Sequence, residues 1–102
     1  MIAVCRADAL AEGEAIRVHA DVPVAIFRSG GQLYAVDDTC THQDASLTDG
    51  YLEGCFVECP LHASTFDLRT GAPSGPPAKV ALRTRTVSVQ DEMIFLVPSA
   101  AP

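Results

Sequence analysis

Cys40-Thr41-His42 and Cys59-Pro60-Leu61-His62 are the two stretches that decide how this sequence is interpreted, and sixteen residues separate them. Each stretch carries one thiolate donor and one imidazole donor, so together they offer four ligands of the types that suit zinc or an iron–sulfur centre. A zinc finger takes its two cysteines from one turn and its two histidines from a helix, and that grouping is absent here. The mixed loops favour a binuclear centre with both thiolates on one iron and both imidazoles on the other. A structural zinc site is the alternative.

The sequence on either side of this pair alternates apolar and polar residues or runs in short apolar blocks, and Gly, Pro, Asp or Ser interrupts it about every eight to twelve residues. That pattern is typical of β-strands. The expected strands are residues 15–19, 22–28, 32–36, 84–89 and 93–97. A short turn at 8–12 is the only candidate helix. The pattern therefore predicts an all-β chain, built as a small antiparallel sandwich or barrel.

Residues 37–77 interrupt the strand pattern with a segment rich in Asp, Thr, Ser, Gly, Pro, Cys and His. A connection of this length in a compact domain normally carries function or structure of its own. Short apolar pieces at 56–57 and 65–66 indicate small strands inside it. We therefore expect one domain over residues 1–102, with an inserted metal-binding subdomain at about 37–77.

Composition limits the classes of function. The 102 residues are 48% hydrophobic and 20% charged, as in an ordinary globular domain. Seven basic residues against thirteen acidic ones give a net charge of −6, which argues against a nucleic-acid or an anionic membrane partner. No apolar run approaches the roughly 20 residues of a membrane span, and no signal peptide is recognisable. A cytoplasmic protein is expected, and nothing marks the four cysteines as two disulfides of a secreted protein.

Residues 40–54 and 58–64 resemble the cluster-binding loops of Rieske 2Fe–2S ferredoxins, the small components of aromatic-ring-hydroxylating dioxygenases. The resemblance covers nearly the whole chain. It implies a Rieske-type antiparallel β-sandwich or barrel with an inserted subdomain. It also implies one 2Fe–2S cluster, with Cys40, His42, Cys59 and His62 as its ligands and the two histidines toward the surface.

The same resemblance implies an electron carrier and not an enzyme. The chain would take single electrons from a flavin-dependent ferredoxin reductase and deliver them to the terminal oxygenase. One alternative keeps the cluster but serves another oxygenase or reductase. The other is a zinc-stabilised β interaction module with no redox role.

Several positions depart from the membrane-anchored respiratory and photosynthetic Rieske proteins. Ala45 and Leu61 stand where those proteins carry an additional disulfide. Ser64 matches a serine whose hydroxyl lies near the cluster sulfurs, whereas Phe66 replaces the corresponding tyrosine. These changes imply a potential toward the low end of the roughly −150 to +300 mV Rieske range. Gln43 stands where relatives often carry glycine.

The remaining polar and sulfur-bearing residues have simpler interpretations. His19 is expected to be a lone imidazole, and Cys5 and Cys55 free thiols. Residues 71–77 are interpreted as a loop covering the cluster or as a plain turn. Six acids form either a docking rim or an ordinary solvated face: Asp37, Asp38, Asp44, Asp49, Glu53 and Glu58.

Overall fold

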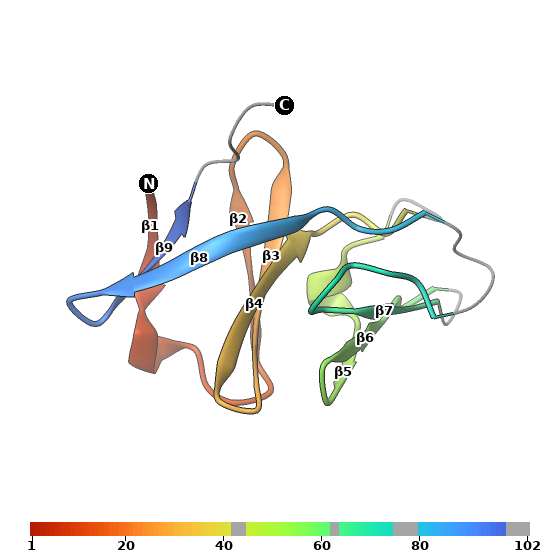
Figure 1. The fold of residues 1–102 in the computed structure, drawn as a ribbon, viewed down its shortest axis with the longest axis horizontal. Helices are drawn as coiled ribbons and strands as arrows, with labels where there is room; N and C mark the ends of the chain where they lie inside the picture. Colours follow the sequence, from red (N-terminus) through yellow and green to blue (C-terminus); the bar gives the residue numbers. More distant parts are fainter. Residues whose placement is uncertain (42–44, 62–63, 75–79, 98–102) are drawn as a thin grey trace.

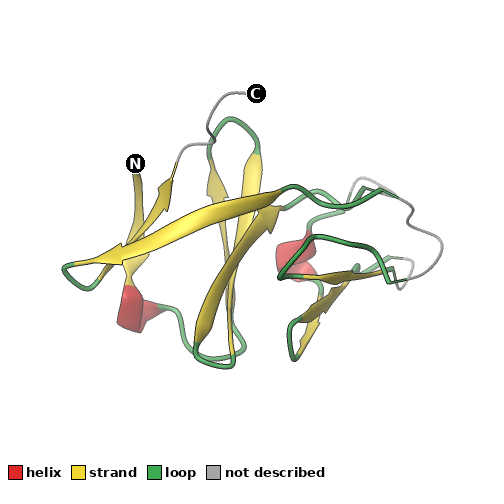
Figure 2. Ribbon diagram, in the orientation of Figure 1, coloured by secondary structure: helices red, strands yellow, loops and turns green. Residues whose placement is uncertain are grey.

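The computed structural model describes residues 1–41, 45–61, 64–74 and 80–97, and almost all regular structure in them is β-strand (Figure 2). The strands are β1 Ile2–Arg6, β2 Ala15–His19, β3 Pro23–Ser29, β4 Gln32–Asp37, β5 Tyr51–Glu53, β6 Phe56–Glu58, β7 Thr65–Asp67, β8 Thr84–Gln90 and β9 Met93–Val97. Two short 3-10 helices accompany them in the described ranges, η1 Ala7–Ala9 and η2 Leu47–Asp49.

Six of these strands form one antiparallel sheet in the order β1-β9-β8-β4-β3-β2, which curls into a nearly closed barrel (Figure 1). The strands β5, β6 and β7 form a second, three-stranded sheet, called the small sheet below. The small sheet lies in the part of the chain between β4 and β8, beside the barrel (Figure 1). The predicted all-β architecture with an insertion between two hairpins is confirmed.

The strand β3 has buried residues on both of its faces. Val24 and Ile26 pack inside the barrel with Ile94 and Leu96 of β9 and other apolar residues, whereas Ala25 and Phe27 face the core of the small sheet. A strand buried on both faces needs a continuous apolar run and not an alternating one. This requirement explains the unbroken apolar block in the sequence of β3.

The turn between β3 and β4 depends on Gly30 and Gly31, which have φ of 61° and 77°. Positive φ at both central residues is the requirement of a tight two-residue hairpin turn, and glycine meets it without strain. The Glu12 carboxylate accepts the N–H groups of Gly30 at 2.6 Å and Gly31 at 3.0 Å, and these hydrogen bonds lower the pKa of Glu12. The expected helical turn at 8–12 is therefore wrong in position, because the helical residues are Ala7–Ala9 and Glu12 holds the hairpin instead.

Candidate metal centre

The two proposed ligand loops are closed by equivalent backbone hydrogen bonds. The Cys40 N–H donates to the Ala45 carbonyl at 2.9 Å, and the Cys59 N–H donates to the Ser64 carbonyl at 2.7 Å. Each cysteine is thus tied to the residue five positions later. His42 and His62 belong to these intervals but lie outside the described residues.

The secondary structure explains where the loops stand. Glu58 and Thr65 are cross-strand partners at the ends of β6 and β7, so the second loop is the tip of that hairpin. The first loop follows β4 and is flanked by an antiparallel bridge between Thr39 and Ser46. Both loops therefore start from paired strands, which hold the ends of each loop at a fixed separation.

The structure brings the two cysteines into one core. Cys40 is 3% exposed and Cys59 is 1% exposed, and both belong to the apolar cluster that contains Val57 and Phe66. Within the described ranges no three Cys, His, Asp or Glu side chains form a metal-binding group, and two of the four proposed ligands fall outside those ranges. The assignment of Cys40, His42, Cys59 and His62 as ligands is a proposal, supported by the burial of both cysteines in one core.

Ser64 gives a direct test of whether a cluster fits between the loops. Its side chain is completely buried, and its Oγ is the only buried side-chain oxygen or nitrogen of the described residues that has no hydrogen-bond partner. Burying a hydroxyl without an acceptor costs about 1–3 kcal/mol, so such groups normally mark a missing partner. A sulfide or thiolate sulfur beside the second loop would accept this hydrogen bond. The buried thiols and this orphaned donor fit a 2Fe–2S group.

Asp38 holds the first ligand loop through hydrogen bonds to its carboxylate. Its carboxylate accepts hydrogen bonds from Ser46 Oγ at 2.6 Å, from Thr48 N at 2.9 Å and from Thr48 Oγ1 at 2.5 Å, and Arg17 Nη1 lies 3.8 Å away. The Asp38 carbonyl also accepts the Leu47 N–H. Asp38 is only 2% exposed. The prediction that it contributes to a docking rim or a solvated face is therefore wrong: this carboxylate is an internal brace.

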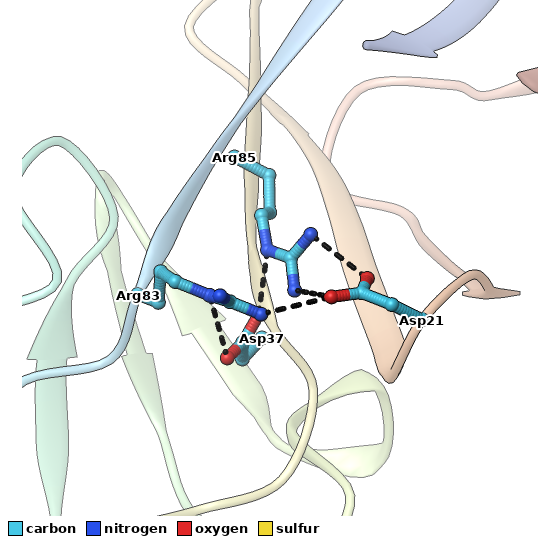
Figure 3. A network of polar contacts seen from close by, with 4 residues as sticks. All are labelled: Asp21, Asp37, Arg83 and Arg85. Carbon is cyan, nitrogen blue, oxygen red and sulfur yellow. Dashed lines mark hydrogen bonds and ion pairs between the residues drawn. The ribbon is translucent and has the colours of Figure 1, made fainter. Parts of the chain in front are cut away.

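The chain leaves the barrel at Asp37 and returns at Arg83, and the two crossings lie side by side because the Asp37 N–H donates to the Arg83 carbonyl at 2.9 Å. Four charged side chains gather at this neck, as Figure 3 shows. Arg85 Nε donates to Asp37 at 2.8 Å and its Nη1 to Asp21 at 3.1 Å. Arg83 Nη2 donates to Asp21 at 3.2 Å, and its Nε forms an ion pair with Asp37 at 3.4 Å.

The neck network shifts the pKa values of Arg85 and Asp21. The Arg85 side chain is 2% exposed, and its burial opposes the charged form. Hydrogen bonds with Asp21 and Asp37 outweigh that penalty and raise the pKa of Arg85. The hydrogen bond from Arg85 likewise lowers the pKa of Asp21. Asp37 is consequently a partner of two arginines and not an unpaired member of a docking rim.

The segments after the second loop contact the first ligand loop and the strand β7. Thr41 Oγ1 donates to the Val80 carbonyl at 2.6 Å, and Phe66 forms an antiparallel bridge with Pro73. Gly71 has φ of 82°, and a Cβ there would lie 2.1 Å from the Leu82 carbonyl oxygen, so this close approach requires glycine. Residues 71–74 thus run beside the small sheet. The predicted covering role of 71–77 falls partly on residues 75–77, outside the described residues.

The other sequence candidates stay apart from this centre. His19 is exposed at the end of β2, in the barrel. Cys5 lies in β1 and Cys55 in the turn between β5 and β6, both half-buried and neither in a disulfide. Gln43 lies outside the described residues. The neck network was not predicted from the sequence, because its arginines and Asp21 lie more than sixty positions apart.

The fold and the paired loops define a class. A family model described as the Rieske [2Fe-2S] domain matches residues 1–91, and the chain belongs to this family. The family carries a Rieske-type 2Fe–2S cluster, which agrees with the fit of the buried thiols and of Ser64.

Among characterised relatives, the chain is 45% identical over 93 residues to the 3-phenylpropionate/cinnamic acid dioxygenase ferredoxin subunit of Escherichia coli K12, covering 89% of this chain and 88% of that protein. The same protein from Shigella boydii gives the same values.

Solved structures agree with these relatives. A chain in the complex of reduced oxygenase and oxidized ferredoxin of carbazole 1,9a-dioxygenase superposes with a TM-score of 0.90 at 38% identity, covering 94% of this chain and all of that one. The ferredoxin of carbazole 1,9a-dioxygenase from Nocardioides aromaticivorans IC177 gives 0.88 at 32% identity, covering 97% and 100%. No helix in the described ranges is long and apolar enough to cross a membrane.

Proposed function

We propose that this protein is the Rieske ferredoxin of an aromatic-ring-hydroxylating dioxygenase, carrying single electrons from a flavin-dependent ferredoxin reductase to the terminal oxygenase. The observation that carries the proposal is the pair of equivalent loops that bring Cys40 and Cys59 into one buried core. The 45% identity to a dioxygenase ferredoxin subunit, spread over 93 residues, supports the same role.

Cys40, His42, Cys59 and His62 would hold the cluster, which when bound accepts and releases one electron. The residues of the chain have two tasks. Cys40 and Cys59 provide thiolates in a dry core, where the low dielectric strengthens their electrostatic interaction with iron. Asp38 and the neck network fix the geometry around the loops, so that little rearrangement accompanies a change of charge.

The protein would not act on the aromatic compound. Its part is to dock briefly with each redox partner, which requires a small interface and fast release. The described acids and the net charge of −6 support steering toward basic surfaces on those partners, and a cytoplasmic location follows from the same role.

The deciding experiment measures the cofactor and the transfer together. Purified protein should be red-brown, contain iron and acid-labile sulfide in equal amounts, and give a rhombic EPR signal on reduction. A colourless protein with one zinc ion would establish the zinc-stabilised interaction module instead. Anaerobic mixing of the reduced protein with candidate terminal oxygenases should reduce the oxygenase, and transfer only to another class of oxygenase or reductase would replace the proposed partner.

A further inference from the structure

The outward face of the small sheet combines aromatic and acidic side chains. Alternation along short strands places Leu52, Val57 and Phe66 toward the core and the intervening residues on the opposite face. Tyr51 pairs with Glu58 across β5 and β6, and Glu53 pairs with Phe56. Each ring therefore lies directly opposite a carboxylate. The two rings are diagonal neighbours, a separation that long side chains can bridge.

This face is hollowed into a groove. The groove has a volume of about 430 Å³, and its walls are Tyr51, Leu52, Glu53, Phe56, Glu58, Thr65 and Ser74. Tyr51 is 64% exposed and Phe56 is 36% exposed, so two rings remain in contact with water. Glu58 directly precedes Cys59, which places one end of the groove beside the second ligand loop. The other end extends away along the β5–β6 hairpin.

The acids of the groove have no basic partner among the described residues. The arginines of the described residues all bind other groups. Arg6 binds Asp8 and Glu92, Arg17 binds Asp38, and Arg28 binds the Leu10 and Ala7 carbonyls. Arg69 binds Asp67, and Arg83 and Arg85 bind Asp21 and Asp37. No ion pair within the described ranges involves Glu53 or Glu58. The groove thus offers two carboxylates and two exposed ring faces without internal compensation.

We infer that this groove receives an arginine-bearing loop of the terminal oxygenase. This contact would be a second one, beside the contact made by the two proposed ligand loops. A guanidinium group stacks on aromatic faces and donates in-plane hydrogen bonds to carboxylates, so arginine matches both features of the groove at once. A second copy of this chain does not match, because it would bring Glu53 and Glu58 against the same acids. The inference rests on the proposed function and adds the site and the chemistry of docking.

Binding is the direct test, because it does not depend on the reduction potential. The dissociation constant of oxidised ferredoxin and oxidised oxygenase is measured by calorimetry for the wild type and for the double variant Glu53→Gln/Glu58→Gln. The variant should bind about three- to tenfold more weakly, since each exposed charge pair contributes up to about 1 kcal/mol. Its affinity should also depend less on salt concentration.

Two matched controls separate the groove from general effects. Glu92→Gln removes an exposed charge from the β8–β9 turn of the barrel and should leave the affinity unchanged. Tyr51→Ser should weaken binding, whereas Val89→Ser, which removes a half-exposed apolar side chain of β8, should not. The visible spectrum of every variant should match the wild type, which shows that the cluster is intact.

Chemical modification tests whether the partner residue is an arginine. Phenylglyoxal modifies arginines, and wild-type ferredoxin should slow this modification of the oxygenase more than the double variant does. Unchanged affinity of the double variant would overturn the inference while leaving the proposed function intact. Weaker binding to the reductase alone, or self-association through the groove, would also overturn it. Failure of the wild type to reduce any terminal oxygenase would instead remove the proposed function.

Discussion

Asp38 shows how a buried carboxylate is accommodated beside a proposed ligand loop. An ionised group inside a protein needs several hydrogen bonds, and Asp38 receives three from Ser46 and Thr48 with Arg17 nearby. All three hydrogen bonds come from residues that directly follow the first ligand loop in the sequence. The carboxylate therefore joins the residues before Cys40 to those after Ala45, independently of the metal.

Replacing Asp38 by alanine should loosen that loop. The change leaves Thr48 N and two hydroxyls without their acceptor, at a cost of about 2–4 kcal/mol. Cluster absorbance should be lost at a lower urea concentration than in the wild type. Asp49→Ala is the matched control, because Asp49 is exposed in the same segment. An Asp38→Ala variant as resistant to urea as its control would show that Asp38 is not a brace.

Ser64 carries a prediction about the potential. If its buried hydroxyl donates to a cluster sulfur, Ser64→Ala removes a hydrogen bond that favours the reduced form, and the reduction potential should fall. A redox titration followed by absorbance measures the change. Ser74→Ala serves as control, since Ser74 is exposed and its Oγ donates to the Thr65 carbonyl at 3.3 Å. Equal potentials for Ser64→Ala and the wild type would place the hydroxyl away from the cluster.

At the scale of elements, sequence patterning predicted the hairpins closely. The expected ranges 15–19 and 93–97 coincide with β2 and β9. The ranges 32–36 and 84–89 end one residue before β4 and β8 do, and 22–28 begins and ends one residue before β3 does. These strands pack apolar faces into a core, so their sequences carry a strong periodic signal.

The elements that were not predicted have weaker local signals. The strand β5 has three residues, and its structure comes from pairing with β6 more than from its own propensity. The strand β1 is an edge strand whose register with β9 shifts between Ala3 and Cys5. Such features depend on contacts made elsewhere in the chain, which a local pattern does not contain.

The β8–β9 turn offers a simple stabilisation. Asp91 and Glu92 have φ of 50° and 64°, in the left-handed region that favours asparagine and glycine. The double variant Asp91→Asn/Glu92→Gly should raise the free energy of unfolding by about 1 kcal/mol, because the exposed Arg6–Glu92 ion pair that it removes contributes little. Thermal unfolding of both proteins checks this, and a lower midpoint for the variant would refute it.

The barrel and the small sheet should respond differently to loss of the cluster. Cys40 and Cys59 belong to the core that contains Val57 and Phe66, whereas the barrel core around Ile26 contains neither cysteine. Metal binding is coupled to folding where the ligands are part of the core. Hydrogen exchange of apoprotein should be fast at the amide of Val57 and slow at that of Ile26. Equal protection of the two amides would contradict this coupling.

At the scale of the whole molecule, stability should fall in acid. Hydrogen bonds from Arg85, from the Gly31 and Gly30 N–H groups and from Arg69 lower the pKa values of Asp21, Glu12 and Asp67 respectively. A carboxyl group with a lowered folded-state pKa stabilises the fold above its unfolded pKa of about 4, and this contribution disappears as pH falls through the folded value. Thermal midpoints should therefore decrease below about pH 4.

The variant Asp21→Asn tests the share of the neck in this acid response. It should be less stable than the wild type at pH 7. Its thermal midpoint should decrease less between about pH 5 and about pH 3, a range that brackets the ordinary carboxyl pKa of about 4. Parallel curves for the two proteins would show that the neck does not contribute to the response.

The sequence pointed to candidate ligands, whose assignment stays a prediction, but not to the residues that support the two loops. Cys40 and Cys59 stand out as candidates because each lies in a short local motif. The neck joins Asp21 to Arg85 across 64 positions, and no local pattern links residues so far apart. Asp38 looked like any surface acid, since burial is a property of the folded chain.

The adjacency of Asp37 and Arg83 has a consequence for the modularity of the fold. Both connections to the segment that carries the proposed ligand loops start from one hydrogen-bonded pair of neighbouring strands, β4 and β8. The segment can therefore be exchanged as a cassette at a single junction, without rethreading the barrel. A chimera that keeps the four charged residues of the neck and takes its intervening residues from another ferredoxin would exchange redox and partner properties on an unchanged support.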